Sequence, residues 1–468
     1  MTTRFEFEPL AEVEAIRAQL DHPVIDADGH LTEHSPLLLD LMEEEVGPAM
    51  AARVRKVLST PDSARPPATV FGTPTKNTLD RATSILPELL RRRLDEFGID
   101  YALLYPGLPL VTVSHEDEEV RRAVARGANR YYAEVFGPHA DRLQAVAVIP
   151  TFTPEEALDE LEHAVVGLGL KAVMLGGIVP ERQPSGEITI RGLGHGSPYD
   201  YDPVWQRCLD LGVAPGFHTV GRGLASRAST TNYVYNHLGH FAWAQETACR
   251  SLIFGGVPKR FPDLRFAFLE GGVGWGCQLY ADMLTHFEKR NREAIMNYDP
   301  SALDVALLDE LFERYAPAAM RPTSGSARPA QSSTVSLDEI DDFAEAGITS
   351  PDDIVDMFTR QFFFGCEGGD AIVPLAFQAD VLPFGRRLRA MFASDIGHWD
   401  VTDMRYVLVE PWELVERGTI DLDDFRAFTC SNVVEMLTST NPDFFAGTAI
   451  ADDVAPYTAG ASTGPRGR

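Results

Sequence analysis

The sequence lacks long hydrophobic runs. A helix that crosses a bilayer needs about 20 consecutive apolar residues, and no run of that kind occurs in the chain. The first residues, MTTRFEFEPLAEVEAIRAQ, are charged and contain no apolar core of a signal peptide. We therefore expect neither a membrane span nor a secretory leader, and we expect a cytoplasmic protein.

Basic charge is also scarce. The chain holds 41 Lys and Arg against 69 Asp and Glu, which gives a formal net charge of −28. Nucleic acids and anionic membranes bind basic surfaces, so this balance argues against both as partners. The five cysteines are scattered without a CxxC pair. This spacing excludes a zinc ribbon and a disulfide framework, and it fits a reducing compartment.

Several catalytic motifs are missing as well. The glycine-rich stretches GLGHGS, GGVGWG and CEGGD do not form a GxGxxG dinucleotide fingerprint. Neither a Walker A loop nor a GxSxG nucleophile elbow occurs. The sequence therefore argues against a nucleotide-redox enzyme and against a serine nucleophile.

Short apolar runs alternate with helical patterns along most of the chain. Near-continuous apolar runs are typical of parallel strands that are buried on both faces. Eight such strands alternating with helices predict one (β/α)8 TIM barrel domain over residues 1–455. The predicted strands span residues 23–28, 99–106, 143–150, 171–176, 213–219, 265–270, 361–366 and 388–394.

Two long insertions interrupt this alternation, at residues 57–85 and 288–348. Loops at the C-terminal face of a barrel commonly cover the active site, so we expect the insertions to cap that face. Surface decoration is an equal alternative for the second insertion. The tail, residues 456–468, is rich in Gly, Ser, Thr and Pro and is expected to be disordered.

The most informative segment is HPVIDADGHLTEHSP, residues 22–36. It leads from an apolar strand into Asp26, Asp28 and His30. Side chains alternate along a strand with period two, so these three residues are predicted to share one face. Two carboxylates and an imidazole are costly to bury together unless a metal or a substrate uses them. The segment therefore indicates a metal-dependent enzyme.

Three further predicted strands end in residues of the same kinds. His218 follows the fifth strand, Glu270 the sixth and Asp395 the eighth. Each of them, taken alone, is compatible with an ordinary polar strand end. Barrel enzymes carry their chemistry at the carboxyl ends of the strands, so the joint occurrence favours one site. Imidazoles and carboxylates without a thiolate suit Zn²⁺, Mn²⁺, Fe²⁺ or Co²⁺ and do not suit a structural zinc site.

Four segments, in this order along the chain, resemble the second amidohydrolase family: VIDADGH, the strand end at His218, KRFPDLRFAFLEGG and FASDIGHWD. That family includes aminocarboxymuconate-semialdehyde decarboxylase, resorcylate-type decarboxylases and several hydrolases. The resemblance covers most of residues 20–450 outside the insertions, and it implies a TIM barrel.

The resemblance also implies a ligand set. Metal ligands fall on Asp28, His30, His218 and Asp395, and Asp28 stands where the family usually has His or Glu. Glu270 is a second departure, since the decarboxylases place a catalytic His before the Gly-Gly pair.

These departures make the predicted pocket rich in carboxylates. Two divalent ions would balance that charge better than one, so we expect one or two ions of iron, zinc or manganese per chain, with Glu270 as a further ligand or a second acid–base group. Asp395 would accept a proton from the metal-activated water. The predicted function is hydrolysis of an organic acid derivative: an amide, an ester, a thioester or a carbon–carbon bond next to a carbonyl.

Other interpretations stay open at this point. The main alternative is a non-oxidative decarboxylase of an aromatic or unsaturated acid, and a ligand-binding barrel without catalysis is a third. His398 is expected to contact substrate or a metal ligand. His237 and His240 lie three residues apart, and either core packing or a catalytic role fits His240. We also expect a homo-oligomer, most simply a dimer.

Overall fold

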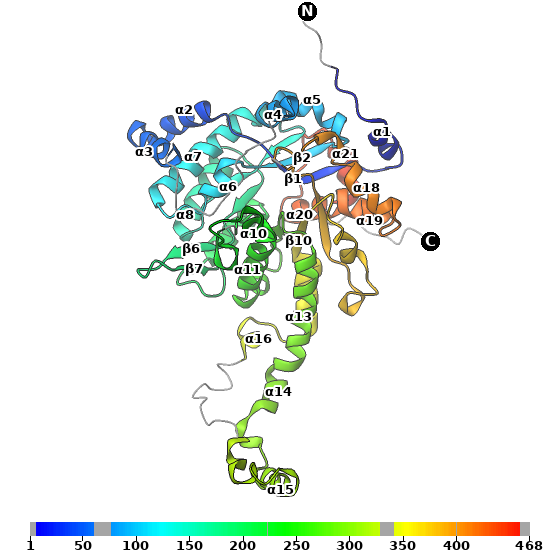
Figure 1. Ribbon diagram of the computed structural model, residues 1–468. Helices are drawn as coiled ribbons and strands as arrows, with labels where there is room; N and C mark the ends of the chain where they lie inside the picture. Colours follow the sequence, from blue (N-terminus) through cyan, green and yellow to red (C-terminus); the bar gives the residue numbers. More distant parts are fainter. Residues whose placement is uncertain (1–5, 60–75, 222, 328–340, 399, 459–468) are drawn as a thin grey trace, which may run out of the picture.

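The computed structural model describes residues 6–59, 76–221, 223–327, 341–398 and 400–458 (Figure 1). Most of the first predicted insertion, part of the second and nearly all of the predicted tail lie outside these residues. The predicted tail disorder and the division into a single domain therefore stay predictions.

All eight predicted barrel strands are present, which confirms the TIM barrel. Each is parallel to its neighbours, and nearly every residue in these strands is buried, which explains why their sequences are continuous apolar runs. The third predicted strand, residues 143–150, is divided into two short strands, β3 (Leu143–Ala145) and β4 (Ala147–Ile149). The other seven are β1 (Ile25–His30), β2 (Tyr101–Tyr105), β5 (Val173–Leu175), β8 (Pro215–Phe217), β9 (Phe266–Phe268), β10 (Phe362–Glu367) and β11 (Arg389–Ala393).

The strand order follows the chain around the barrel. One sheet has the order β1-β2-β3 and the other β11-β10-β9-β8-β5-β4, and Val146 links β3 to β4. The barrel closes between β1 and β11: the backbone N–H of Asp395 donates to the Asp28 carbonyl at 3.0 Å, and that of His30 donates to the Ile396 carbonyl at 2.7 Å. This closure brings the first and last strand ends of the predicted site together.

A hairpin that the sequence did not predict follows β5. Its strands, β6 (Val179–Arg182) and β7 (Ile188–Arg191), pair antiparallel, and most of their residues are partly or fully exposed. Such a hairpin has no continuous apolar run, so it carries little of the signal that marked the barrel strands.

Helices separate most of the strands and surround the barrel in Figure 1. They are α1 (Ala11–Arg17), α2 (Ser35–Val46), α3 (Pro48–Ser59), α4 (Thr78–Ile85), α5 (Pro87–Phe97), α6 (Leu108–Thr112), α7 (Glu118–Val135), α8 (Pro154–Leu161), α9 (Asp202–Leu211), α10 (Tyr233–His237), α11 (His240–Phe254), α12 (Val257–Arg260), α13 (Gly274–Arg290), α14 (Arg292–Ile295), α15 (Val305–Tyr315), α16 (Asp342–Glu345), α17 (Pro351–Asp356), α18 (Val409–Glu416), α19 (Leu422–Arg426), α20 (Asn432–Thr440) and α21 (Ala451–Val454). Among the described residues, no helix combines the length and apolar character needed to cross a membrane.

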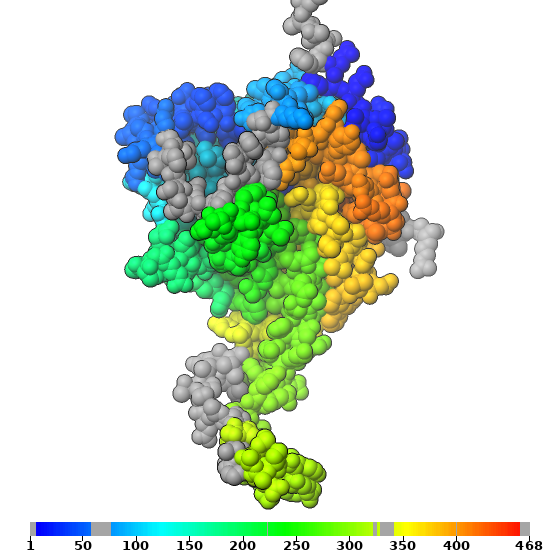
Figure 2. Space-filling model, viewed as in Figure 1, coloured from blue at the N-terminus to red at the C-terminus, as the bar shows by residue number. Residues whose placement is uncertain are grey.

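The second insertion projects from the body as an arm (Figures 1 and 2). We call residues 291–321 the arm; it includes α14 and α15. Because β9 and β10 are parallel neighbours, the chain between them must return from the carboxyl ends of the strands to their amino ends. The 17 residues of α13 make this return, so the arm begins at the amino-end side of the barrel.

The expectation that this insertion caps the C-terminal face is therefore wrong for its described part. An insertion after a barrel helix lies on the side opposite the strand ends that carry the predicted site. For the first insertion, residues 60–75 are not described, so its predicted capping role stays a prediction.

Buried ion pairs fix the helices that lead into β2. Arg93 on α5 is 1% exposed. Its Nη1 lies 2.7 Å from Asp80 Oδ1, and its Nε lies 2.6 Å from Glu96 Oε2. The second oxygen of Asp80 accepts the backbone N–H of Met404, which follows β11, at 2.9 Å. The guanidinium thus holds α4 and α5 to the closing segment of the barrel.

Replacing Arg93 tests this attachment. We expect Arg93→Ala to lower the free energy of unfolding by about 3–5 kcal/mol, because two buried carboxylates lose their cation. Arg92→Ala is the matched control, since Arg92 pairs with Glu88 on the exposed face of the same helix; its effect should stay below about 1 kcal/mol. Urea denaturation followed by circular dichroism measures both. Equal losses in the two variants would contradict the assigned role.

Candidate metal centre and active site

The end of β1 supplies the first two residues of the site. His30 Nδ1 donates to the Pro106 carbonyl at 3.3 Å, with the tautomer assigned from this contact, so its Nε2 faces the barrel axis. Around that nitrogen lie Asp395 Oδ1 at 3.4 Å and Asp28 Oδ1 at 3.6 Å. Both side chains from β1 are 1–2% exposed.

His218 and Glu270 complete the opposite side. His218 Nε2 lies 2.7 Å from Glu270 Oε2, 3.5 Å from Asp28 Oδ1 and 3.2 Å from His30 Nε2. The site therefore joins the ends of β1, β8, β9 and β11, as the positions of these residues along the sequence predicted.

Two of these residues have strained backbones. Glu270 and Asp395 have φ angles of 57° and 53°, in the left-handed region that residues other than glycine rarely adopt. Each lies two residues after the end of a barrel strand, β9 or β11, where this turn aims its side chain into the centre. Strain of this kind persists where the surrounding structure fixes it, and it is common at functional sites.

The carboxylates of the centre are short of partners. Within the described residues, Asp28 Oδ1, Glu270 Oε2 and Asp395 Oδ1 are buried and make no hydrogen bond of acceptable geometry. Burial raises the pKa of Asp28 and of Glu270 well above the usual range, and the charge of Asp395 raises both further. Oxygens that converge under such repulsion fit a divalent cation, which would compensate their charge.

The imidazoles suit the same ion. Burial lowers the pKa of His30 and of His218 well below the usual value, so both rings are neutral near pH 7. Neutral imidazole is the form that binds a metal. Among the residues that the structure describes, two groups of side chains have the spacing of metal ligands, and His30 belongs to both. One group is Asp28, His30 and His218, and the other is His30, Glu270, Asp395 and His398.

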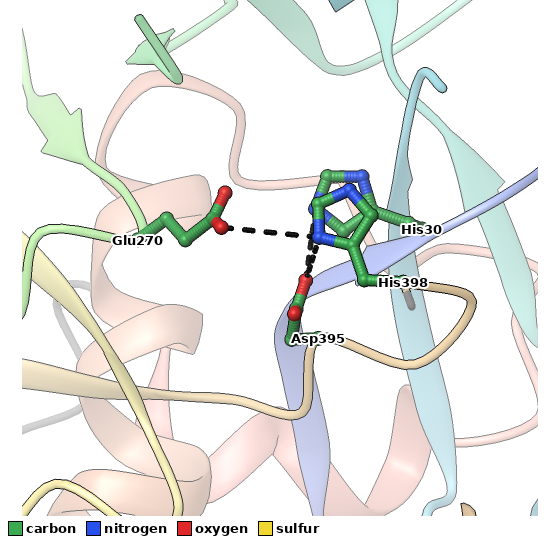
Figure 3. A group of neighbouring side chains, drawn as sticks. All are labelled: His30, Glu270, Asp395 and His398. Carbon is green, nitrogen blue, oxygen red and sulfur yellow. Dashed lines mark ion pairs between the residues drawn. The ribbon is translucent and has the colours of Figure 1, made fainter. Parts of the chain in front are cut away.

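His398 covers the centre. Its ring stacks on His30 with centroids 3.7 Å apart, and its Nδ1 lies 2.5 Å from Asp395 Oδ1 and 3.8 Å from Glu270 Oε1 (Figure 3). Burial disfavours its cation, but the Asp395 carboxylate raises its pKa above the usual value. With a side chain 22% exposed, His398 lies between the buried Asp395 carboxylate and solvent.

Asp26 does not join the metal-ligand groups, which corrects the predicted common face. The register between β1 and β2 shifts between Asp26 and Gly29, so the strict alternation is broken. Asp26 instead accepts the backbone N–H of Ser394 at 2.9 Å and also the Ser394 hydroxyl. Burial raises its pKa to about 7. Its contacts hold the end of β11 against β1, just before Asp395.

His240 also lies outside the two metal-ligand groups. It is the first residue of α11, and its Nδ1 accepts the backbone N–H of Gly221 at 3.3 Å. Its ring packs on Phe241, whose ring meets His218 edge-on with centroids 5.2 Å apart. His240 thus supports the loop after β8, and the predicted catalytic role for it stays a prediction.

Sequence reasoning missed Gln245. This buried side chain on α11 donates through Nε2 to the carbonyls of Phe217, at 2.9 Å, and Leu269, at 3.0 Å. These carbonyls immediately precede His218 and Glu270, so one amide group fixes the spacing of both. No signal marks it in the sequence, where it is one polar residue within a helical pattern.

Comparison with known proteins identifies the family. A model of the amidohydrolase family matches residues 25–320. The gamma-resorcylate decarboxylase of Rhodococcus jostii (strain RHA1) is 27% identical over 199 residues, which cover 40% of this chain and 56% of that protein. The match therefore spans little more than half of the relative's length. The family resemblance that the motifs indicated is confirmed.

Solved structures show the same fold. A dihydroxybenzoic acid decarboxylase from Polaromonas sp. JS666, with bound manganese and the inhibitor 2-nitroresorcinol, is 18% identical with a TM-score of 0.50; the match covers 89% of this chain and 97% of that one. An amidohydrolase from Mycobacterium avium subsp. paratuberculosis K-10 is 16% identical with a TM-score of 0.53, over 89% and 100% of the two chains.

The prediction of hydrolysis is wrong in light of the curated relative, which is a decarboxylase. The prediction counted Glu270 as a further full negative charge, which favoured two metal ions over one and a metal-activated water. In the structure Glu270 lies against His218, and burial raises its pKa, so it need not add a full negative charge. The predictions of thioesterase activity and of iron or zinc lose their support with it.

The metal-ligand role of His218 has a direct test. We expect His218→Ala to lose bound divalent metal almost completely, because its Nε2 lies 2.7 Å from Glu270 Oε2 and 3.5 Å from Asp28 Oδ1, in the middle of the donor set. Elemental analysis of the purified protein measures the metal-to-chain ratio. His286→Ala on the exposed face of α13 is the control and should keep the wild-type ratio. An unchanged ratio in His218→Ala would refute the role.

Proposed function

Because the chain belongs to the amidohydrolase family, we propose that it is a metal-dependent, non-oxidative decarboxylase of an aromatic or unsaturated carboxylic acid. The observation that carries this proposal is the similarity to a gamma-resorcylate decarboxylase. The donor set supports it, because the buried carboxylates and imidazoles at four strand ends suit a divalent ion.

The reaction needs no redox partner. The bond between the substrate carboxylate and its α-carbon breaks, and CO₂ leaves. The electron pair of that bond stays on the carbon, which gains one proton. The site must therefore hold an acid beside the carbon and return a proton to that acid after each turnover.

The site must also bind an anionic substrate, and the residues that face the proposed metal fit this requirement. Asp28, His30, His218 and Glu270 would hold a divalent ion, for which manganese is our candidate because the Polaromonas decarboxylase structure contains it. When bound, such an ion attracts the oxygens of an acidic substrate and offsets negative charge. Without a cation, the carboxylates of the site would repel the substrate.

Asp395 is our candidate for the acid. Its Oδ1 faces the centre, and His398 Nδ1 lies 2.5 Å away on the side that reaches solvent. His398 can therefore return a proton to Asp395 after each turnover. Glu270 is the poorer candidate, since its Oε2 lies 2.7 Å from His218 in the interior of the cluster.

Isotopes separate decarboxylation from hydrolysis. The enzyme is assayed with a panel of hydroxybenzoates, beginning with 2,6-dihydroxybenzoate, once in D₂O and once in H₂¹⁸O. We expect CO₂ to be released in both. The organic product should carry one deuterium at the carbon that lost the carboxylate and no ¹⁸O. Mass spectrometry measures both labels. An organic product that gains ¹⁸O without release of CO₂ would overturn the proposal.

Substitution of Asp395 tests the proton donor. We expect Asp395→Asn to lower kcat by about 10²- to 10⁴-fold, since the amide cannot supply the proton. KM and metal content should change little if the residue acts mainly as an acid. Asp380→Asn, on an exposed segment, is the control and should retain wild-type kcat. Loss of metal in parallel with loss of activity would show that Asp395 is a ligand rather than the acid.

A further inference from the structure

The arm carries an apolar surface that the body of the chain does not cover. None of the residues of α15 is buried. One face of the helix and the turn after it line a groove of about 320 Å³, formed by Leu308, Leu311, Phe312, Tyr315, Ala316, Pro317 and Met320. Tyr315 is 71% exposed and Leu311 42%. A helix with an apolar stripe normally packs that stripe against another element.

The arm is also acidic. It contains six Asp and Glu residues against three Arg. Within α15, Glu310 and Glu313 lie beside the apolar stripe, and both are exposed. Each has only a long, solvent-exposed ion pair within the arm, Glu310 with Arg314 at 3.7 Å and Glu313 with Arg321 at 3.4 Å, and such pairs contribute little. A surface that fits the arm must therefore combine exposed apolar groups with excess positive charge.

Such a surface lies at the amino ends of β10 and β11. A cavity of about 540 Å³ there is lined by Arg360, Arg386, Arg387 and Arg389, with Asp356 as the one acidic residue in its wall. We call it the arginine pocket. Four arginines around one cavity are unusual in a chain with a net charge of −28.

Two of these arginines are uncompensated. Arg387 pairs with Asp424 and Arg389 pairs with Glu435, both at 2.7 Å. Within the part of the chain that the structure describes, neither Arg360 nor Arg386 forms an ion pair, and both are exposed. Their charges are available to acidic groups that come from outside.

Apolar groups stand beside the arginine pocket. Phe384 is 58% exposed and Val381 is 63% exposed, in the turn that precedes Arg386. This turn is held to α13, because the Tyr280 hydroxyl donates to the Pro383 carbonyl at 3.0 Å. The pocket and its apolar rim therefore lie next to the helix from which the arm projects.

The arm does not reach the arginine pocket of its own chain. In Figure 1, α15 lies at the far tip of the arm, well away from β10. Yet the arm and the pocket are on the same, amino-end side of the barrel. Two copies that face each other across this side would each present an arm to the pocket of the other.

We propose that the arm of one chain docks on the arginine pocket of a second copy, and that the contact is reciprocal in a twofold dimer. The apolar stripe of α15 packs on the rim at Val381 and Phe384. Glu310 and Glu313 exchange their exposed partners within the arm for Arg360 and Arg386. A stable interface buries roughly 1,200–2,000 Å² in total, and a twofold axis repeats the contact, so each arm has to supply only about half of that area. This inference is independent of the proposed decarboxylation.

Charge reversal provides the test. The arm variant carries Glu310→Arg and Glu313→Arg, and the pocket variant carries Arg360→Glu and Arg386→Glu. In multi-angle light scattering, the wild-type chain should have twice the mass of the 51.5 kDa chain. Each variant alone should have the mass of one chain, because like charges then meet at both contacts.

Mixing the two variants restores opposite charges on the arm and the pocket at both contacts. In a mixed dimer the reversed arm meets the reversed pocket, and the wild-type arm meets the wild-type pocket, so both contacts are complementary. We expect an equimolar mixture to regain the dimer mass. The control carries Glu12→Arg and Glu14→Arg, two exposed residues of α1, which Figure 1 shows at the opposite end of the molecule from α15; it should remain a dimer.

Three results would overturn the proposal. They are a monomeric wild-type chain, a dimer that survives reversal of the pocket, and folded variants that stay monomeric when mixed. A dimer lost by arm reversal but kept by pocket reversal would show that the arm packs on another surface. Circular dichroism and melting temperatures establish that each variant is folded.

Discussion

The mutual repulsion of buried carboxylates is the constraint on which the site depends. Asp28, Glu270 and Asp395 converge at the centre of a barrel, where water is excluded and like charges interact strongly. The closure of β1 on β11 and the strained turns at Glu270 and Asp395 hold them together. Such an arrangement is unfavourable for folding by itself, and a bound cation turns it into a favourable one. We therefore regard metal binding as part of the fold of this site.

The barrel could be predicted because parallel strands that are buried on both faces have nearly continuous apolar sequences. The eight apolar runs and their alternation with helical patterns were sufficient to predict the (β/α)8 fold. The elements around the barrel were less predictable. The hairpin of β6 and β7 is largely exposed, so its strands have no continuous apolar sequence to mark them. The second insertion was expected over the site, but its place after α13 puts it on the opposite side.

The residues of the site were predictable, whereas their electrostatics were not. Polar side chains after buried strands identified His218, Glu270 and Asp395, but the bulge in β1 that diverts Asp26 to Ser394 left no signal. The preference for hydrolysis came from counting formal charges. Burial decides which carboxyl groups keep a proton, and burial at a strand end is a property of the folded barrel.

The most direct test of this account is to locate the ion. In a crystal grown with Mn²⁺, an anomalous difference map recorded above the manganese edge should show its strongest peak among His30 Nε2, His218 Nε2 and the carboxylates of Asp28 and Glu270. The same map from a His218→Ala crystal should lose that peak. A strongest peak elsewhere, or an empty centre in a crystal of the active protein, would contradict the claim that a cation holds this site together.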